Sequence, residues 1–258
     1  MSSILYTKEN AIAVIKLNRA DKFNSFNKEM ALAMQQALDD AANDKLIRCI
    51  YITGEGKAFC AGQDLAEAMD ANGPGIENIV RKHYNPIIKK IREVEKPVVC
   101  AVNGVAAGAG ANIALACDVV VAGASVSFIQ AFSKIGLVPD SGGTFFLPRL
   151  IGLQRASALM MLGDKVAAAD ALQMGMLYKV FDDAVLQDEA MKIAVTLSQM
   201  PTKGIGLTKK LLNQSMFSTL EKQLEAEGDL QVAAAKSYDY NEGVNAFLEK
   251  RKPVFKGE

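Results

Sequence analysis

The stretch that decides the fold runs from Val98 to Gly143 and reads VVCAVNGVAAGAGANIALACDVVVAGASVSFIQAFSKIGLVPDSGG. Its first part is small and apolar, and no charged residue lies between Pro97 and Cys117. Its last part carries an acid, Asp140, within VPDSGG. A glycine-rich helix start and a carboxylate in an apolar loop are two halves of a candidate active site.

Within and before this stretch, strands repeatedly lead into glycine-bearing turns. We expect strands at 98–102, 119–121 and 126–128, a turn at 104–108 and a short helix at 109–116. The β-branched run 47–53 predicts an earlier strand that ends at the turn 54–56, and residues 59–64 then lead into a helical or loop region that extends through Asp70. This order predicts an α/β fold of stacked ββα units with ligand-binding loops at one end of the strands.

The flanking segments give the chain two regions. We predict strands at 4–6, 11–17 and 176–181, and helices at 28–43 (with Asn27 as N-cap), 79–94, 155–162, 167–174, 185–198, 206–215, 219–236 and 239–250. Residues 1–198 would form the core with the active site, and residues 199–258 a helical region that packs on that core or on a neighbouring subunit.

Composition narrows the function classes. Lys+Arg and Asp+Glu are both 29, so the net charge of zero argues against a general nucleic-acid or membrane surface. The cysteines at 49, 60, 100 and 117 contain no CxxC pair, so we expect buried free thiols in a reducing compartment. The N-terminal ten residues resemble no secretory signal, which favours a cytoplasmic location. Asn and Gly residues interrupt the apolar run after Pro97, so it is not expected to span a membrane.

The single histidine, His83, makes a histidine-rich metal site impossible, and no cysteine cluster compensates for it. A Ser–His–Asp hydrolase would have to combine His83 with Ser141, and no GxSxG motif is present. His83 lies on a predicted amphipathic helix, where it either packs or contacts a substrate.

The glycines at 108 and 110 have three possible readings. A dinucleotide fingerprint would need a small residue at 113, where the chain has Ile113. Small residues also permit close packing of a helix on a strand. The third reading is chemical: free N–H groups at a helix start stabilise developing negative charge and can form one side of an oxyanion hole.

Asp140 has two readings as well. Apolar neighbours would raise its pKa if the side chain is buried, and it could then act as a general base near neutral pH. Alternatively, it is a turn aspartate before Ser-Gly-Gly.

Several motifs in order resemble the crotonase superfamily, also called the enoyl-CoA hydratase/isomerase family, over essentially the whole chain. They are LNRADKFNSF (17–26), KAFCAGQDL (57–65), the segment 96–118 and IGLVPDSGG (135–143). The resemblance implies a crotonase-like right-handed spiral of ββα units with a C-terminal helical trimerisation region. It also implies homotrimers, commonly stacked as dimers of trimers, and no metal or redox cofactor, because the coenzyme A thioester is the substrate.

The resemblance is strongest to the branch of the family that isomerises ring-epoxide phenylacetyl-CoA to an oxepin-CoA and moves the double bond of unsaturated acyl-CoA esters. It implies that Asp140 is the base and that the backbone N–H groups of Gln63 and Ala109 form the oxyanion hole. Typical hydratases of the family carry two glutamates, and the matching positions here are Asn112 and Phe132. That difference argues against simple hydration.

The resemblance also implies the substrate contacts. The coenzyme A moiety would pass Lys22, Phe23, Ser25, Ala61, Asp64 and Leu65, although relatives use Asp64 and Asp118 structurally. Tyr84 and Phe132 would shape the acyl pocket. Phe255 and Lys256 match positions near the adenine end, sometimes in a neighbouring subunit, unless they belong to a frayed terminus.

The leading hypothesis is therefore an acyl-CoA isomerase that uses Asp140. The alternatives are an enoyl-CoA hydratase or lyase, a non-catalytic acyl-CoA-binding or scaffold protein, and a thioesterase that uses Ser141 and His83.

Overall fold

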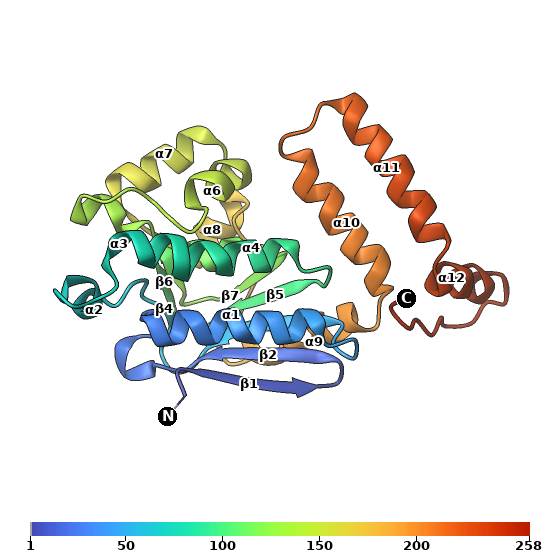
Figure 1. The fold of residues 1–258 in the computed structure, drawn as a ribbon, viewed down its shortest axis with the longest axis horizontal. Helices are drawn as coiled ribbons and strands as arrows, with labels where there is room; N and C mark the ends of the chain where they lie inside the picture. Colours follow the sequence, from blue (N-terminus) through green and yellow to red (C-terminus); the bar gives the residue numbers. More distant parts are fainter. Residues whose placement is uncertain (1) are drawn as a thin grey trace.

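A six-stranded sheet with the order β1-β2-β3-β5-β7-β10 runs through the computed structural model, which describes residues 2–258 (Figure 1). Its strands are β1 (Ile4–Glu9), β2 (Ile12–Leu17), β3 (Cys49–Gly54), β5 (Val98–Val102), β7 (Val119–Gly123) and β10 (Lys179–Phe181). β1 pairs antiparallel with β2, and the other neighbouring strands are parallel. This arrangement confirms the predicted α/β class.

A second sheet has four short strands in the order β4-β6-β8-β9: β4 (Ala58–Cys60), β6 (Val105–Ala107), β8 (Ser127–Ile129) and β9 (Lys165–Ala167). β3, β5 and β7 each lead through a turn into β4, β6 and β8, respectively. The prediction of a plain turn at 104–108 was wrong. Three-residue strands are too short to show periodicity, and β6 forms because β4 and β8 pair with it.

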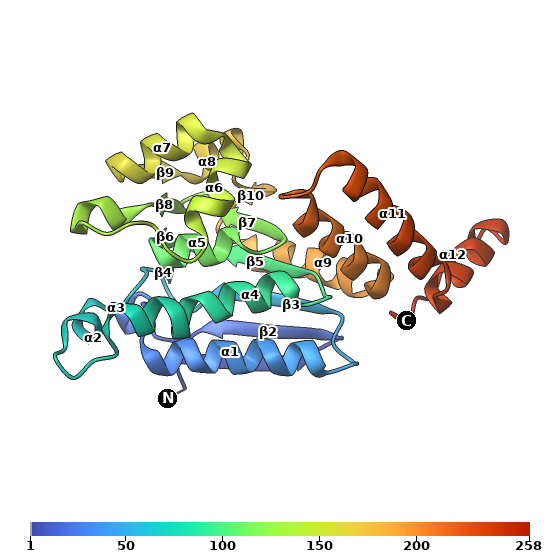
Figure 2. The same cartoon turned by 45° about the horizontal axis from the view of Figure 1, so that its top comes forward.

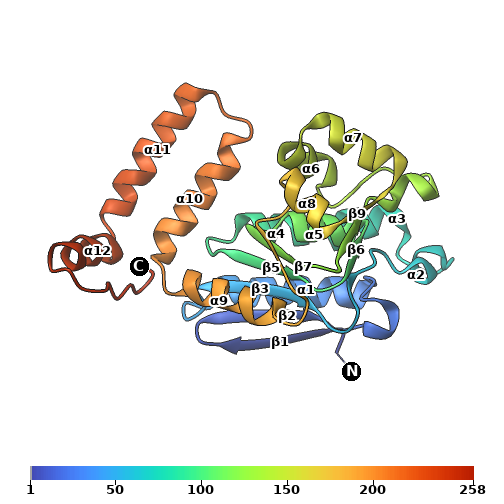
Figure 3. The ribbon, with the colours of Figure 1, turned by 180° about the vertical axis from the view of Figure 1, so that it is seen from behind.

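The four middle strands of the six-stranded sheet, β2, β3, β5 and β7, are buried on both faces, and their alternate residues enter two separate apolar cores. In β3, Ile50 and Ile52 belong to the core shared with α1 (Lys28–Asn43), α4 (Asn85–Glu93) and α5 (Ala109–Leu115), whereas Cys49 and Tyr51 belong to the core beneath α9 (Leu186–Ser198). Figure 3 shows α9 on the face opposite α1 and α4. The site lies on the α5 side.

The remaining helices are α2 (Leu65–Met69), α3 (Gly75–Asn78), α6 (Gly143–Ile151), α7 (Leu153–Leu162), α8 (Ala168–Met174), α10 (Thr202–Ser215), α11 (Leu220–Ala235) and α12 (Tyr238–Leu248), with 3₁₀ turns η1 (Ala20–Lys22) and η3 (Ala131–Ile135). The bounds predicted for α1 were correct, and its N-cap is confirmed because the Asn27 side chain accepts a hydrogen bond from the Met30 N–H at 2.9 Å. The sequence did not predict α6.

The single helix predicted at 79–94 is interrupted. Ile79–Tyr84 form a π-helix, η2, between α3 and α4. The wider turn brings both His83 and Tyr84 into the interior, with 5% and 1% of their surfaces exposed. π-Helical turns often occur at functional sites, and this one contributes Tyr84 to the candidate site.

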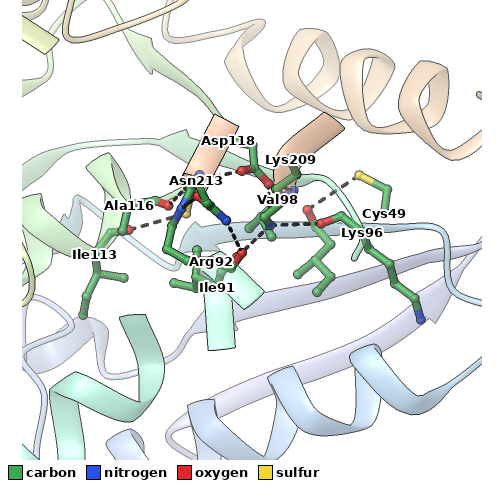
Figure 4. A network of polar contacts seen from close by, with 12 residues as sticks. Cys49, Ile91, Arg92, Lys96, Val98, Ile113, Ala116, Asp118, Lys209 and Asn213 are labelled. Carbon is green, nitrogen blue, oxygen red and sulfur yellow. Dashed lines mark hydrogen bonds and ion pairs between the residues drawn. The ribbon is translucent and has the colours of Figure 1, made fainter. Parts of the chain in front are cut away.

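The helices α10, α11 and α12 follow α9 and extend away from the two sheets (Figures 1 and 2). A polar network around the buried Lys209 fixes α10 to the core: the Lys209 ammonium lies 2.7 Å from one Asp118 oxygen, and Arg92 lies 2.9 Å from the other (Figure 4). Asn213 of α10 also bonds to Arg92. Asp118 therefore has a structural role. The division into two regions after residue 198 stays a prediction.

Two further expectations concern the whole chain. All four cysteines are buried and free, as predicted. Within residues 2–258, no helix combines the length and the apolar character that crossing a membrane requires.

Candidate active site

Asp140 lies in the loop between η3 and α6, partly buried beside the exposed Val138. Burial raises the pKa of its carboxyl group to about 6, although a hydrogen bond from the Ser141 hydroxyl at 3.0 Å opposes this shift. Near neutral pH, such a group is mostly ionised and can still hold a proton during a reaction. This is the behaviour expected of a general base.

The backbone around Gln63 presents an N–H group with no acceptor. Residues 26 and 63 form a parallel bridge in which the Phe26 N–H donates to the Gly62 carbonyl at 2.7 Å and the Asp64 N–H donates to the Phe26 carbonyl at 2.8 Å. The Gln63 N–H lies between these bonds, and no hydrogen bond to an acceptor is found for it within residues 2–258. It is available to a ligand.

Ala109 provides a second N–H group on an adjoining segment. As the first residue of α5, it has no acceptor within its helix. A Cβ added to Gly62 would lie 3.0 Å from the Ala107 carbonyl oxygen and 3.7 Å from the Ala109 nitrogen, so the two segments are in contact. The structure thus brings the two predicted oxyanion-hole residues together.

The start of α5 depends on Gly108, whose φ of 53° and ψ of −126° are unfavourable for residues with a Cβ. The ring of Phe132 lies beside it, with Cζ 3.6 Å from where a Cβ would stand. Phe132 is 7% exposed. It therefore forms an apolar wall beside Gly108, the residue before Ala109.

Tyr84 contacts the site through Gln63. Its hydroxyl donates to the Gln63 side-chain carbonyl at 2.8 Å, and the Gln63 amide lies 3.3 Å from Glu67. Burial and, secondarily, negative neighbours that include Asp140 raise the pKa of Tyr84 well above its ordinary value. Tyr84 is therefore neutral at physiological pH, and in this structure it supports the Gln63 segment.

The predicted coenzyme A contacts form one surface from two segments. The Ala61 N–H donates to the Phe23 carbonyl at 2.9 Å, which joins residues 22–25 to residues 61–65. Lys22, Phe23, Ala61 and Leu65 are exposed, whereas Ser25 is buried. This surface offers a cation and apolar side chains to a ligand.

Asp64 is held within the protein. Its carboxylate pairs with Arg19 at 2.8 Å and caps α2 by accepting from the Ala66 N–H at 3.1 Å. Burial opposes ionisation, but these hydrogen bonds lower the pKa of Asp64 below its ordinary value. Asp64 thus orders the loop, as Asp118 orders the C-terminal helices, and Arg19 is a site-supporting residue that the sequence did not single out.

Phe255 and Lys256 lie away from these residues in the single chain. The Phe255 carbonyl accepts from Arg48 at 2.8 Å, just before β3, whereas Asn24 bonds to the carbonyl groups of Glu55 and Ala58, just after it. The length of a six-residue strand, about 20 Å, separates these positions. One chain does not bring the C-terminal tail to the predicted coenzyme A surface.

No hydrogen bond joins His83 and Ser141 within residues 2–258, because the Ser141 hydroxyl donates to Asp140 and the His83 side chain has no bonded partner. Burial lowers the pKa of His83. The geometry does not support a Ser–His hydrolase.

Sequence reasoning missed Gln130, whose side-chain amide donates to the Asn112 side-chain carbonyl at 2.8 Å. The Asn112 amide in turn donates to the Asp140 backbone carbonyl at 2.9 Å. The only available signal was a polar residue at the end of the apolar strand β8.

The loops before α2, α5 and α6 thus carry two available N–H groups, of Gln63 and Ala109, and the carboxyl group of Asp140, and the Asn112 side chain joins α5 to the Asp140 loop. This combination is suited to an enolate. The chain belongs to the enoyl-CoA hydratase/isomerase family, whose pattern matches residues 7–258, and it is an enzyme of that family. This finding confirms the predicted crotonase-like fold.

Among individual relatives, the chain is 45% identical to the 1,2-epoxyphenylacetyl-CoA isomerase of Escherichia coli (strain K12), with 100% of each chain covered. It is 36% identical to the trans-2-decenoyl-[acyl-carrier-protein] isomerase of Streptococcus mutans serotype c, with 99% of this chain and 98% of that one covered. A solved structure from Mycobacterium abscessus, assigned to enoyl-CoA hydratase/isomerase, matches with a TM-score of 0.94 and 37% identity over 99% of this chain and 100% of that one.

Proposed function

We propose that the protein is an acyl-CoA isomerase in which Asp140 transfers a proton between two carbons of a coenzyme A thioester. The substrates would be epoxyphenylacetyl-CoA, converted to oxepin-CoA, and 3-enoyl-CoA, converted to 2-enoyl-CoA. The observation that carries the proposal is the partly buried carboxyl of Asp140, whose pKa of about 6 suits a base near neutral pH. The similarity to a 1,2-epoxyphenylacetyl-CoA isomerase supports the choice of substrates.

In the proposed reaction of 3-enoyl-CoA, the Asp140 carboxylate removes a proton from the carbon next to the thioester. The electron pair of that C–H bond moves toward the thioester oxygen, and the enolate charge is stabilised by the N–H groups of Gln63 and Ala109. Asp140 then returns the proton to the far carbon of the double bond, and the electrons flow back. Atoms and charge balance with one base and no added water.

Two features support isomerisation over hydration, the alternative reaction within the family. The Asn112 amide is engaged by Asp140 and Gln130, and Phe132 has no polar group. Neither residue can activate a water molecule as a carboxylate could. The name of the family covers both reactions, so hydratase activity is the second candidate. A non-catalytic acyl-CoA-binding role is the third.

We also propose that a neighbouring copy of the chain completes the coenzyme A site, within a homotrimer or a dimer of trimers. The distance between Phe255 and the Lys22 segment in one chain supports this arrangement. α11 buries no residue in the single chain, and Leu220 and Leu224 on it are 69% and 57% exposed. Light scattering coupled to size-exclusion chromatography would give the mass, and a monomer would contradict this part of the proposal.

We further propose that the protein acts in the cytoplasm. Its four buried free cysteines support this location, because they suit a reducing compartment.

The decisive experiment assays the purified protein and Asp140→Asn with epoxyphenylacetyl-CoA, 3-enoyl-CoA and crotonyl-CoA. We expect Asp140→Asn to lose at least about 10³-fold in kcat for isomerisation, because proton transfer by one base carries the reaction. Affinity for an unreactive acyl-CoA should change less than about threefold, since the ligand-facing N–H groups remain.

Asp164→Asn is a matched control, because it removes an exposed carboxylate between α7 and β9, outside the candidate site and outside α11. Isomerisation that persists in Asp140→Asn would refute the assignment of the base. Efficient hydration of crotonyl-CoA would favour the second candidate, and tight binding without any turnover would favour the third.

A further inference from the structure

Two buried amides connect the end of β8 to the loop that carries Asp140. The Asp140 backbone carbonyl can only accept, so the group 2.9 Å from it must be the Asn112 NH₂ group. The Asn112 side-chain carbonyl then faces Gln130 and requires a donor, which the Gln130 NH₂ group supplies at 2.8 Å. The orientation of both amides is thereby fixed.

From this arrangement we propose that Asn112 and Gln130 act as positioning residues, through an amide relay that holds the Asp140 backbone in the place that proton transfer requires. The amide relay denotes the two hydrogen bonds from Gln130 to Asn112 and from Asn112 to the Asp140 carbonyl. The inference rests on the proposed function, since it assigns a role toward the same base.

Both amides of the relay are buried, so each depends on its protein partner for its hydrogen bond. Asn112 is 0% exposed and Gln130 is 3% exposed, so water does not replace a lost partner. The Gln130 NH₂ group donates to Asn112, and no hydrogen-bond partner is found for the Gln130 side-chain oxygen within residues 2–258, so Asn112 is the one side-chain partner that holds Gln130. A pair of amides that served packing alone would be replaced by apolar side chains at little cost.

The position of Asn112 links the base to the proposed oxyanion hole. Asn112 lies three residues after Ala109 on α5, about one helical turn away. Its own N–H donates to the Gly108 carbonyl at 3.1 Å, and the Gly108 N–H donates to the carbonyl of Ile129, the residue before Gln130, at 2.9 Å. One rigid unit therefore sets the distance between the Ala109 N–H and the Asp140 backbone.

Gly143 provides the space for this contact. A Cβ at position 143 would lie 2.3 Å from the Asn112 side-chain nitrogen, which is closer than real Cβ atoms approach. The Gly143 N–H also donates to the Asp140 carbonyl at 2.9 Å, so that oxygen accepts two bonds. Alanine at this position would displace the Asn112 amide without removing any polar group.

The backbone after Asp140 needs such support. Ser141 has a φ of 51°, a left-handed conformation that a serine adopts at a cost and keeps only when its surroundings enforce it. Without the amide relay, the loop can relax and turn the Asp140 carboxyl toward water.

The pKa of Asp140 reports whether its carboxyl group stays in its buried position, because no charged group among its neighbours within residues 2–258 titrates near the same pH. The Ser141 hydroxyl bonds to it, and Tyr84, the titratable neighbour across from it on η2, stays neutral because burial raises its pKa. A carboxyl group that moves into water loses the shift caused by burial.

The test measures kcat and KM for 3-enoyl-CoA isomerisation between pH 5 and pH 9 in the full-length protein, for Asn112→Leu, Gly143→Ala and the double variant. We expect kcat to fall by about 10²-fold in Asn112→Leu, the loss typical of a misplaced catalytic group, with KM changed less than about threefold. The acid limb of the kcat profile should move to lower pH, because Asp140 becomes more exposed to water. Gly143→Ala should shift the limb in the same direction.

The double variant separates a shared contact from two unrelated defects. Because both substitutions break the same hydrogen bond, their combined effect on kcat should not exceed the larger single effect. Fully multiplied effects would overturn the proposal.

Asn213→Leu is the matched control. Asn213 also pairs its amide with a backbone carbonyl, that of Arg92, but it does so on α10. Asn213→Leu should lower the unfolding temperature and leave the acid limb of the kcat profile in place. Asn112→Leu would give this same result if Asn112 had only a structural role. A wild-type acid limb and kcat in Asn112→Leu and Gly143→Ala would overturn the proposal, and Gly143→Ala decides alone if Asn112→Leu does not fold.

Asp140→Asn distinguishes the two levels of inference. An inactive Asp140→Asn together with a normal Asn112→Leu refutes the amide relay alone, whereas an active Asp140→Asn refutes the proposed function itself.

Discussion

Replacing the proposed base should make the protein more stable. Burial raises the pKa of Asp140 from its ordinary value of 3.8 to about 6, so the ionised form is disfavoured in the folded state. Each step of one in pKa corresponds to about 1.4 kcal/mol, so this shift corresponds to about 3 kcal/mol. Asparagine carries no charge, and its side-chain oxygen can still accept the Ser141 hydrogen bond. We expect Asp140→Asn to raise the free energy of unfolding at pH 7 by about 2–3 kcal/mol.

The sign follows from proton linkage. Between pH 3.8 and about 6, the folded state binds more protons at Asp140 than the unfolded state does, so this residue makes stability fall as the pH rises through that window. Above it, the cost of the buried charge is complete and constant. The advantage of Asp140→Asn should therefore be full at pH 7 and shrink as the pH is lowered toward 4.

Urea denaturation at pH 7.5, 6, 5 and 4.5, at one fixed protein concentration, would measure this dependence. Asp164→Asn, at an exposed position between α7 and β9, should change the free energy of unfolding by less than about 0.5 kcal/mol at every pH. Equal or lower stability of Asp140→Asn at pH 7.5 would refute the reasoning, because it would mean that the native Asp140 carboxylate is not disfavoured by burial.

Two further predictions concern stability, one for the ion pair of Lys209 and one for the close packing at Gly110. Lys209→Met should lower the free energy of unfolding by about 1.5–3 kcal/mol, since Asp118 and the Ile91 carbonyl lose a charged hydrogen-bond donor, whereas the exposed neighbour Lys210→Met should have little effect; equal denaturation midpoints for the two would argue against the network. Gly110→Ala should destabilise the protein by about 1–3 kcal/mol, because its Cβ would lie 2.5 Å from the Cys60 carbonyl oxygen; an unchanged unfolding temperature would show that α5 can shift.

Local sequence signals predicted the long elements well. α1 has an N-cap, apolar periodicity and no interruption, and both of its ends were correct. β5 was also correct at both ends, because five consecutive buried residues follow Pro97. The local sequence of these two elements is sufficient to predict where each begins and ends.

Elements that depend on neighbours were missed. β4 and β6 each have three residues and exist because a second sheet pairs them. α6 begins after Gly142 and contains Pro148, and both residues indicate a break when the sequence is read alone. The π-helical turn at 79–84 is equally invisible to a helical period.

In the candidate site, too, residues with a local sequence signal were predicted, and residues whose contacts depend on the fold were missed. Asp140 could be singled out from its apolar loop, and the resemblance pointed to Gln63 and Ala109. The bond between Gln130 and Asn112 joins residues 18 positions apart, because β6 and β8 lie side by side. No local pattern contains that register, so only the folded chain shows the contact.

The two-sided burial of the central sheet has a consequence for how the protein can change. Tyr51 and Val99 point toward α9, whereas their neighbours Ile52 and Cys100 point toward the helices that carry the site. The sheet acts as a partition, so repacking on the α9 side need not disturb the geometry of α5. Substitutions on opposite sides should affect stability additively. The α9 layer is thus a region in which sequence can drift, or be redesigned, while the chemistry is preserved.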